Sequence, residues 1–185
     1  LALSVVVSAF SALAVTYTWD GGGTNNNWST GDNWDPNGAV PVSASNTTVK
    51  LNGMTRPTQA QDIASPFVLN RLEFNQGTAA FTLSGSPFQF VTNSPSPAYL
   101  YLDRNATCVI NNAIEIPEGT TLMLQIGTWG VELRGLISGA GALDKLEQAG
   151  GITLTYANNT FSGGFSVRAQ DNDWFKANVN ASGAM

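Results

Sequence analysis

The chain has 185 residues, of which 43% are hydrophobic and only 11% are charged, against roughly 25% charged residues in ordinary globular domains. This length and apolar content exclude a disordered chain and fit one domain with a real core. The net charge of −5 and the lack of a basic run exclude nucleic-acid binding, which needs a cationic surface.

Residues 1–15, LALSVVVSAFSALAV, carry no charge and allow two interpretations. They match the apolar region of a secretory signal peptide, with residues 12–14 as an Ala-x-Ala cleavage site. They also alternate with period 2, as a strand with one apolar face does. Such a strand could be donated to a neighbouring subunit and join copies into a homopolymer. Its candidate contact residues are Leu1, Leu3, Val5, Val7, Leu13 and Val15.

Neither interpretation of residues 1–15 places the chain across a membrane. The apolar run is shorter than the ~20 residues that a membrane-spanning helix needs. We therefore expect no membrane span, and the choice between signal remnant and retained strand stays open at this point.

Residues 16–53 set three tryptophans, Trp19, Trp28 and Trp34, among Gly, Asn, Asp and Ser. One interpretation is an end cap, in which the indole rings cover the apolar first turn of a solenoid. The other is a glycan-binding platform, on which exposed rings stack against sugars of a cell-surface ligand. We favour the cap.

The same segment contains half of a calcium-loop motif. Asn33, Asp35 and Asn37, followed by Gly38, fit the first part of the pattern, but Ala44 stands where a bidentate Glu is required. Turns rich in Asn and Asp are much commoner than metal sites. We therefore expect no cofactor and keep calcium only as a weak candidate at these three residues.

From residue 54 onward the chain is predicted to form solenoid turns. Residues 54–66 contain two prolines and read as a loop. Short apolar runs separated by Gly, Asn and Pro turns then follow. The predicted strands are 47–51, 67–69, 72–74, 80–83, 88–91, 99–102, 108–110, 113–116, 122–126 and 131–133. The single cysteine, Cys108, lies in one of these runs and should point into the core.

The stretch 135–169 carries the most regular pattern. It reads ISGAG-x-L over 137–143, then Lys145, GITLT over 151–155 and NTFSGG-x-x-V over 159–167. This order resembles the autotransporter-associated β-strand repeat of bacterial surface and secreted proteins, although Asp144 and the pair Glu147 and Gln148 depart from it. The resemblance implies an all-β, right-handed parallel β-helix located outside the cell.

We expect the chain to have no catalytic activity. The chain has no histidine, which removes Ser-His and Cys-His mechanisms and most metal hydrolases. Carboxylate chemistry, as in a β-helix polysaccharide lyase or hydrolase, would need pairs such as Asp103 with Arg104 or Glu132 with Arg134. Solvated turns explain these pairs better. We therefore expect a non-enzymatic extracellular structural protein, a stalk or a filament subunit, with a glycan-binding adhesin module as the alternative.

Overall fold

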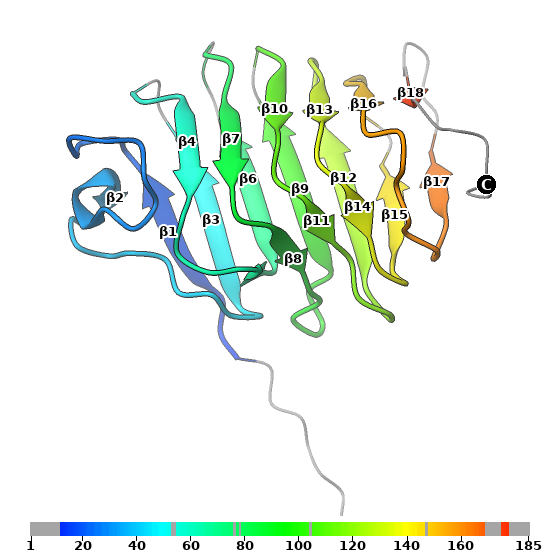
Figure 1. Cartoon of the computed structure of the whole chain (residues 1–185), viewed down its shortest axis with the longest axis horizontal. Coiled ribbons are helices and arrows are strands. Elements are labelled where there is room, and N and C mark those ends of the chain that lie inside the picture. Colours follow the sequence, from blue (N-terminus) through cyan, green and yellow to red (C-terminus); the bar gives the residue numbers. More distant parts are fainter. Residues whose placement is uncertain are drawn as a thin grey trace, which may run out of the picture.

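The chain winds into a β-solenoid of about five turns. In the computed structural model three sheets run side by side along one axis, with the N-terminal strands at one end and the C-terminal strands at the other (Figure 1). The structure describes residues 12–52, 55–75, 77, 79–103, 105–146 and 148–168, and the backbone of 175–177. The expected all-β parallel solenoid is confirmed.

Each turn contributes one strand to each sheet in the middle of the molecule. The eight-stranded sheet, called sheet A, contains β1 Val15–Trp19, β2 Trp34–Asp35, β3 Thr47–Leu51, β6 Arg71–Asn75, β9 Ala98–Asp103, β12 Thr121–Ile126, β15 Ala142–Lys145 and β17 Phe165–Val167. The six-stranded sheet B contains β4 Thr58–Gln61, β7 Thr82–Gly85, β10 Cys108–Ile110, β13 Val131–Leu133, β16 Ile152–Leu154 and β18 Phe175–Ala177. The four-stranded sheet C contains β5 Phe67–Leu69, β8 Phe88–Phe90, β11 Ile114–Glu115 and β14 Ile137–Ser138. A 3-10 helix, η1, spans Gly31–Asn33.

The stack is held in register by its inward side chains. In sheet A, Val49 pairs with Leu72, Leu72 with Leu100, and Leu100 with Leu124, all four pointing into the core. Because side chains alternate along a strand, the neighbours of these residues point outward. A slip of one residue would exchange the two faces, so the buried row fixes the register.

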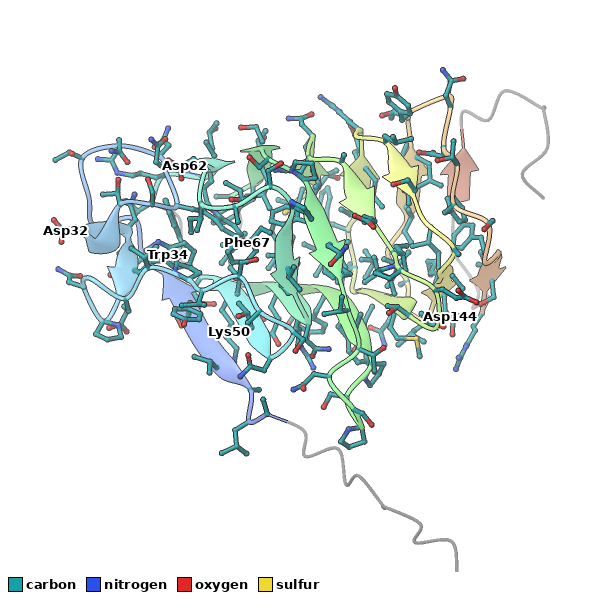
Figure 2. The ribbon with its side chains drawn as sticks, turned by 60° about the horizontal axis from the view of Figure 1, so that its bottom comes forward. Asp32, Trp34, Lys50, Asp62, Phe67 and Asp144 are labelled. Carbon is teal, nitrogen blue, oxygen red and sulfur yellow. The ribbon has the colours of Figure 1, made fainter. Side chains whose placement is uncertain are left out.

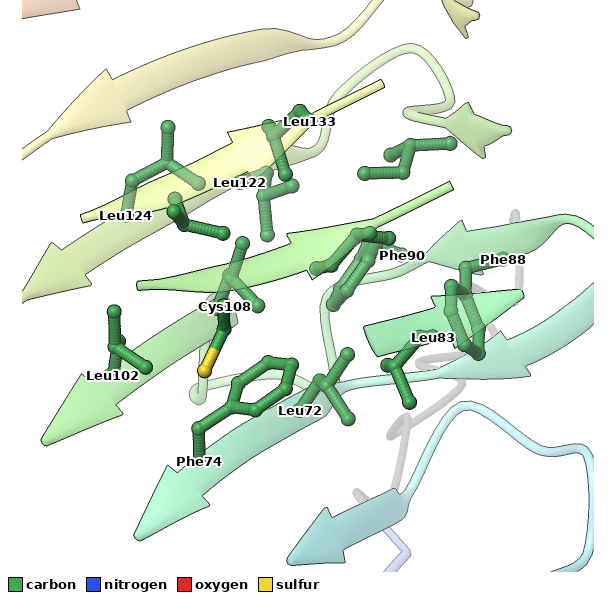
Figure 3. Close-up of a cluster of buried hydrophobic side chains, with 14 of the residues drawn as sticks. Leu72, Phe74, Leu83, Phe88, Phe90, Leu102, Cys108, Leu122, Leu124 and Leu133 are labelled. Atoms are coloured by element: carbon green, nitrogen blue, oxygen red, sulfur yellow. The ribbon is translucent and has the colours of Figure 1, made fainter. Parts of the chain in front are cut away.

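The core is a continuous column of leucine, isoleucine and phenylalanine side chains (Figure 3). Phe74 packs against Phe81 with ring centroids 6.0 Å apart. Cys108 is fully buried in this column, as expected for a small apolar side chain. Among the described residues the longest strands have six residues, so each turn depends on its neighbours for burial.

Buried amide side chains complete the corners between sheets. Asn70 donates its Nδ2 hydrogens to the carbonyls of Val91 at 2.9 Å and Pro97 at 3.1 Å. Asn112 does the same for Ser84 and Ser86, both at 2.8 Å. These amides satisfy backbone carbonyls that leave the ladders at the bends, where an unpaired buried group is costly.

One prediction from the sequence is wrong in part. Residues 54–66 contain β4, not only a loop, and its side chains Gln59 and Gln61 are 1% exposed. Of the N-terminal segment predicted to alternate, residues 12–14 are irregular, β1 begins at Val15, and residues 1–11 lie outside the described part of the chain. Within the described part of the chain, no helix is long or apolar enough to cross a membrane.

Candidate functional site

The three tryptophans of the N-terminal segment lie inside the molecule. Trp19, Trp28 and Trp34 are each 0% exposed. Trp34 stands edge-on to both others, with ring centroids 5.1 Å from Trp19 and 5.4 Å from Trp28. Trp28 continues the stack onto Phe67 at 5.6 Å. Figure 2 shows Trp34 and Phe67 in the N-terminal part of the solenoid. The cap interpretation therefore fits the structure.

The burial of these rings corrects the glycan-platform interpretation. A ring that stacks on a sugar must expose one face, and none of the three does. Their indole N–H groups are also engaged. Trp28 Nε1 donates to Gln59 Oε1 at 3.0 Å, Trp34 Nε1 to the Trp28 carbonyl at 2.8 Å, and Trp19 Nε1 to the Thr55 carbonyl at 3.3 Å.

The buried Asn33 side chain holds the loop of this cap together through hydrogen bonds to three backbone groups. Its Oδ1 accepts the N–H of Gly23 at 3.0 Å, and its Nδ2 donates to the carbonyls of Asn25 and Asn27. A Cβ on Gly23 would lie 2.7 Å from Asn33 Oδ1, closer than real side chains approach. The loop therefore needs glycine at this position so that its backbone N–H can approach and bond Asn33 Oδ1.

The Asn33 side chain therefore binds backbone groups of the cap loop and does not have the role that the predicted calcium site would give it. Asn33 is fully buried, whereas Asp35 and Asn37 are exposed to solvent. Among the described residues, no group of three or more His, Cys, Asp or Glu side chains could hold a metal ion. The turns of this segment and the hydrogen bonds of Asn33 account for its many Asn and Asp residues.

All three sheets have their N-terminal edge covered at specific positions. In sheet A, β2 runs antiparallel to β1 and pairs Trp34 with Trp19. In sheet B, Trp28 N–H bonds the Ala60 carbonyl at 2.9 Å. In sheet C, Ala44 N–H bonds the Val68 carbonyl at 3.0 Å. Covered edges are the usual protection against uncontrolled strand pairing.

The candidate donor-strand residues fall into two groups. Leu1, Leu3, Val5 and Val7 lie outside the described residues. Leu13 and Val15 are described and are 89% and 43% exposed. Val15 belongs to β1, whose partner β3 lies in the same chain, and Leu13 is held through its carbonyl, which accepts from Asn46 Nδ2 at 2.6 Å.

A second cluster lies on the outward side of sheet A, and we call it the tyrosine face. It consists of two parallel rows, of which the first crosses β3, β6, β9, β12 and β15 and the second crosses β3, β6, β9 and β12. The first row is Thr48, Arg71, Tyr99, Met123 and Asp144, and the second is Lys50, Glu73, Tyr101 and Gln125. Lys50 on β3 and Asp144 on β15 lie toward opposite ends of the tyrosine face in Figure 2.

Arg71 contacts three other side chains of the tyrosine face. Its guanidinium carbon lies 4.8 Å from the centre of the Tyr99 ring and 5.9 Å from that of Tyr101, within the range of cation–π attraction. It also forms an ion pair with Glu73, which is joined by Lys50 at 3.7 Å. The arginine is thus held in place by two rings and one carboxylate.

The electrostatics of this face act on Tyr101. Burial raises the pKa of Tyr101 above its ordinary value of 10.0. The Asp103 carboxylate raises the Tyr101 pKa further by its charge and by accepting a hydrogen bond, Glu73 adds to the rise, and Arg71 opposes it. The phenol is therefore a neutral hydrogen-bonding group throughout the physiological pH range.

The C-terminal part of sheet A has its own charged pair. Asp144 accepts hydrogen bonds from Ser166 Oγ at 2.6 Å and from Arg168. Beside them is an open depression of about 310 Å³ lined by Gln125, Leu146, Gln148 and Arg168. This volume is at the lower end for ligand pockets, and the depression is open, whereas ligand pockets enclose most of their ligand.

The carboxylate pairs considered for catalysis are not brought together into one site. Glu132 on β13 of sheet B forms an ion pair with Arg134, which follows the strand, while Asp103 lies on sheet A. Arg104 lies outside the described residues. Asp62, near the cap, accepts hydrogen bonds from the Ser29 N–H and hydroxyl at 2.8 and 2.6 Å, which ties the cap to the first turn.

Comparisons with family models, with curated proteins and with solved structures give no match to this chain. The fold and the surface geometry described above are therefore the basis for the function proposed below.

Sequence reasoning did not find the tyrosine face. The alternation of Tyr99, Leu100, Tyr101 and Leu102 predicts which side chains point outward. It does not predict that Arg71, from the preceding turn, lies over both rings, because that depends on the pairing between turns. The repeat length varies along the chain, so the partner strand cannot be read from spacing alone.

Proposed function

We propose that this protein is a non-enzymatic structural module of the extracellular space or the bacterial cell surface, in which the solenoid acts as a rigid spacer. The observation that carries the proposal is the continuous core. Its large aromatic rings and its inward leucines are used for packing between turns and for closing the N-terminal end.

The physics of the fold supports this role. Each turn adds about 4.8 Å along the axis, so five turns span about 24 Å. Neighbouring turns in the middle of the solenoid are joined by backbone ladders in sheets A, B and C at the same time. Bending between turns would stretch at least one ladder, and the module should therefore hold the parts of a longer assembly at a fixed separation.

The surface composition supports an extracellular location. Only 11% of the residues are charged, so solubility depends on Ser, Thr, Asn and Gln. The resemblance of residues 135–169 to the autotransporter-associated repeat points to the same location. Assembly of copies into a filament belongs to this proposal, with the N-terminal segment as the candidate contact.

Protease accessibility tests the location. In intact cells that produce the protein with an epitope tag, proteinase K added outside should remove the tagged chain without lysis. Detergent-lysed cells and a cytoplasmic marker serve as controls. Protection of the chain until the cells are lysed would contradict the proposed location.

An activity screen tests the non-enzymatic part. Incubation with a panel of acidic and neutral polysaccharides should release neither reducing ends nor unsaturated products above a heat-denatured control. Product release that is abolished by Asp103→Asn or Glu132→Gln would support a carbohydrate-active enzyme instead.

A further inference from the structure

We propose that the tyrosine face is a self-association surface, on which a second copy of this chain packs side by side with its solenoid axis parallel to the first. The proposal rests on the structural role given above and adds the partner and the contact surface. It uses only side chains of sheet A that lie within the described residues.

The chemistry of the face is that of a protein interface. Tyr, Arg and Met are enriched in interfaces, and Tyr and Arg are among the most frequent hot-spot residues. Here Arg71, Tyr99, Tyr101 and Met123 lie together, half-buried, in the middle of the sheet. The outward residues of sheet B on β10 and β16, Val109 and Thr153, provide no such group beside Glu132.

The central side chains are also ordered before any partner binds. Arg71 is fixed by the two tyrosine rings and by Glu73. Glu73 accepts a further hydrogen bond from Asn75 Nδ2 at 3.0 Å. Because these side chains already have one geometry, association costs little additional conformational entropy.

The charges select a second copy in a parallel arrangement. Arg71 and Glu73 lie on the same strand, one in each row. A two-fold axis parallel to the solenoid exchanges the rows, so that Arg71 faces Glu73 of the second copy and Glu73 faces its Arg71. The same operation places Tyr99 against Tyr101 of the second copy. This is the self-complementarity that an isologous interface requires.

The antiparallel arrangement pairs fewer charges. Its two-fold axis lies in the interface along the strands, between β9 and β12, and brings β6 opposite β15 of the second copy. The rows are then not exchanged, so Arg71 faces Asp144, which is already paired with Arg168, and Glu73 gains no opposite charge. The parallel arrangement pairs both charges of β6, with both N-terminal caps at the same end.

The area of the face indicates a weak association. Five strands at about 4.8 Å and a strand length of about 17–20 Å give roughly 400–480 Å² for each copy. The total of roughly 800–960 Å² is below the ~1,200–2,000 Å² of stable specific interfaces and in the range of weak ones. We therefore expect a reversible dimer, populated at concentrations of tens of micromolar and above.

The decisive experiment mixes two charge variants. Sedimentation velocity of the unaltered chain, from about 1 to 500 µM, should show a monomer–dimer equilibrium. Arg71→Glu makes the pair uniformly negative and Glu73→Arg makes it uniformly positive, so each variant alone should lose at least about tenfold in dimer affinity. An equimolar mixture should recover the dimer, because opposite faces then meet.

A matched control exists on sheet B. Glu132 on β13 and Arg134, just after its end, form the same kind of ion pair between residues two apart in the sequence. Glu132→Arg and Arg134→Glu should leave the dimer affinity unchanged. Far-UV circular dichroism of every variant establishes that it is folded, and the recovery on mixing is itself a readout that misfolded variants cannot give.

Three results would overturn the proposal. They are a chain that stays monomeric at 500 µM, an association that neither single variant weakens, and variants that do not associate when mixed. None of them would affect the proposed spacer role, which is tested by the rigidity of one copy.

Discussion

Replacing Trp28 with alanine tests whether the cap holds the first turn of the solenoid together. Trp28 is fully buried and contacts the rings of Trp34, Phe67 and Phe88, at centroid distances of 5.4, 5.6 and 5.5 Å. Burying an aromatic ring of this kind stabilises a fold by about 3–5 kcal/mol, as judged from Phe and Trp to Ala substitutions.

The lost hydrogen bond increases the cost of Trp28→Ala. Gln59 Oε1 would lose its donor, while Gln59 Nε2 already has no partner in the buried site. Leaving a buried polar group unsatisfied costs about 1–3 kcal/mol. We therefore expect a total loss of about 4–8 kcal/mol, which is a large part of the 5–15 kcal/mol that typically stabilises a domain.

Urea denaturation followed by circular dichroism measures the free energy of unfolding. Trp129, which is 50% exposed, provides the control, and Trp129→Ala should change it by less than about 0.5 kcal/mol. If Trp28→Ala does not fold, Trp28→Phe keeps most of the ring packing and isolates the loss of the indole N–H. A loss below about 2 kcal/mol for Trp28→Ala would refute the reasoning.

Two further predictions concern the turns and the tyrosine face. Gly85 has a φ of +99° and a Cβ there would lie 2.2 Å from the Gln61 carbonyl oxygen, whereas Gly119 has a φ of +75° with open space around it. Gly85→Ala should therefore cost more than about 3 kcal/mol in urea denaturation and Gly119→Ala only about 1 kcal/mol, and equal costs would contradict this. Asp103→Asn should lower the pKa of Tyr101 while leaving it above 10.0, because the carboxylate charge disappears and a neutral amide oxygen is a weaker acceptor, but the burial remains. Ultraviolet absorbance titration with Tyr101→Phe as the reference measures this shift, and an unchanged or raised pKa would count against it.

The apolar strands were predictable because their pattern is local. Cys108–Ile110 and Val131–Leu133 alternate between inward and outward side chains and end at turn residues, so the sequence predicts their limits. Their direction also follows, since short strands that cannot bury a face alone must stack on the next turn.

The polar parts of the core could not be predicted in the same way. Gln59 and Gln61 are buried because one accepts the Trp28 indole N–H and the other bonds the backbone of Ile63 and Ala64. These partners come from the cap and from the adjoining bend. A polar tetrapeptide such as Thr58–Gln61 reads as a loop until its partners are known.

The cap illustrates a similar limit. Three tryptophans among Gly and Asn residues predict aromatic rings on a turn-rich segment. Both an end cap and a glycan-binding platform have that composition. Burial distinguishes them, and it results from β2 turning back along β1 so that Trp34 meets Trp19. That antiparallel pairing has no signal in the hydrophobic periodicity.

The distance between two spin labels tests the central claim, a rigid capped spacer, most directly. The labels are placed on Asn37→Cys in the cap and Ala157→Cys near the last turns, both exposed positions, while the buried Cys108 remains unlabelled. Pulsed electron paramagnetic resonance of the dilute, monomeric chain should give one narrow distance distribution. A broad or multi-peaked distribution would contradict the account, because the cap and the last turns would then not move as one body.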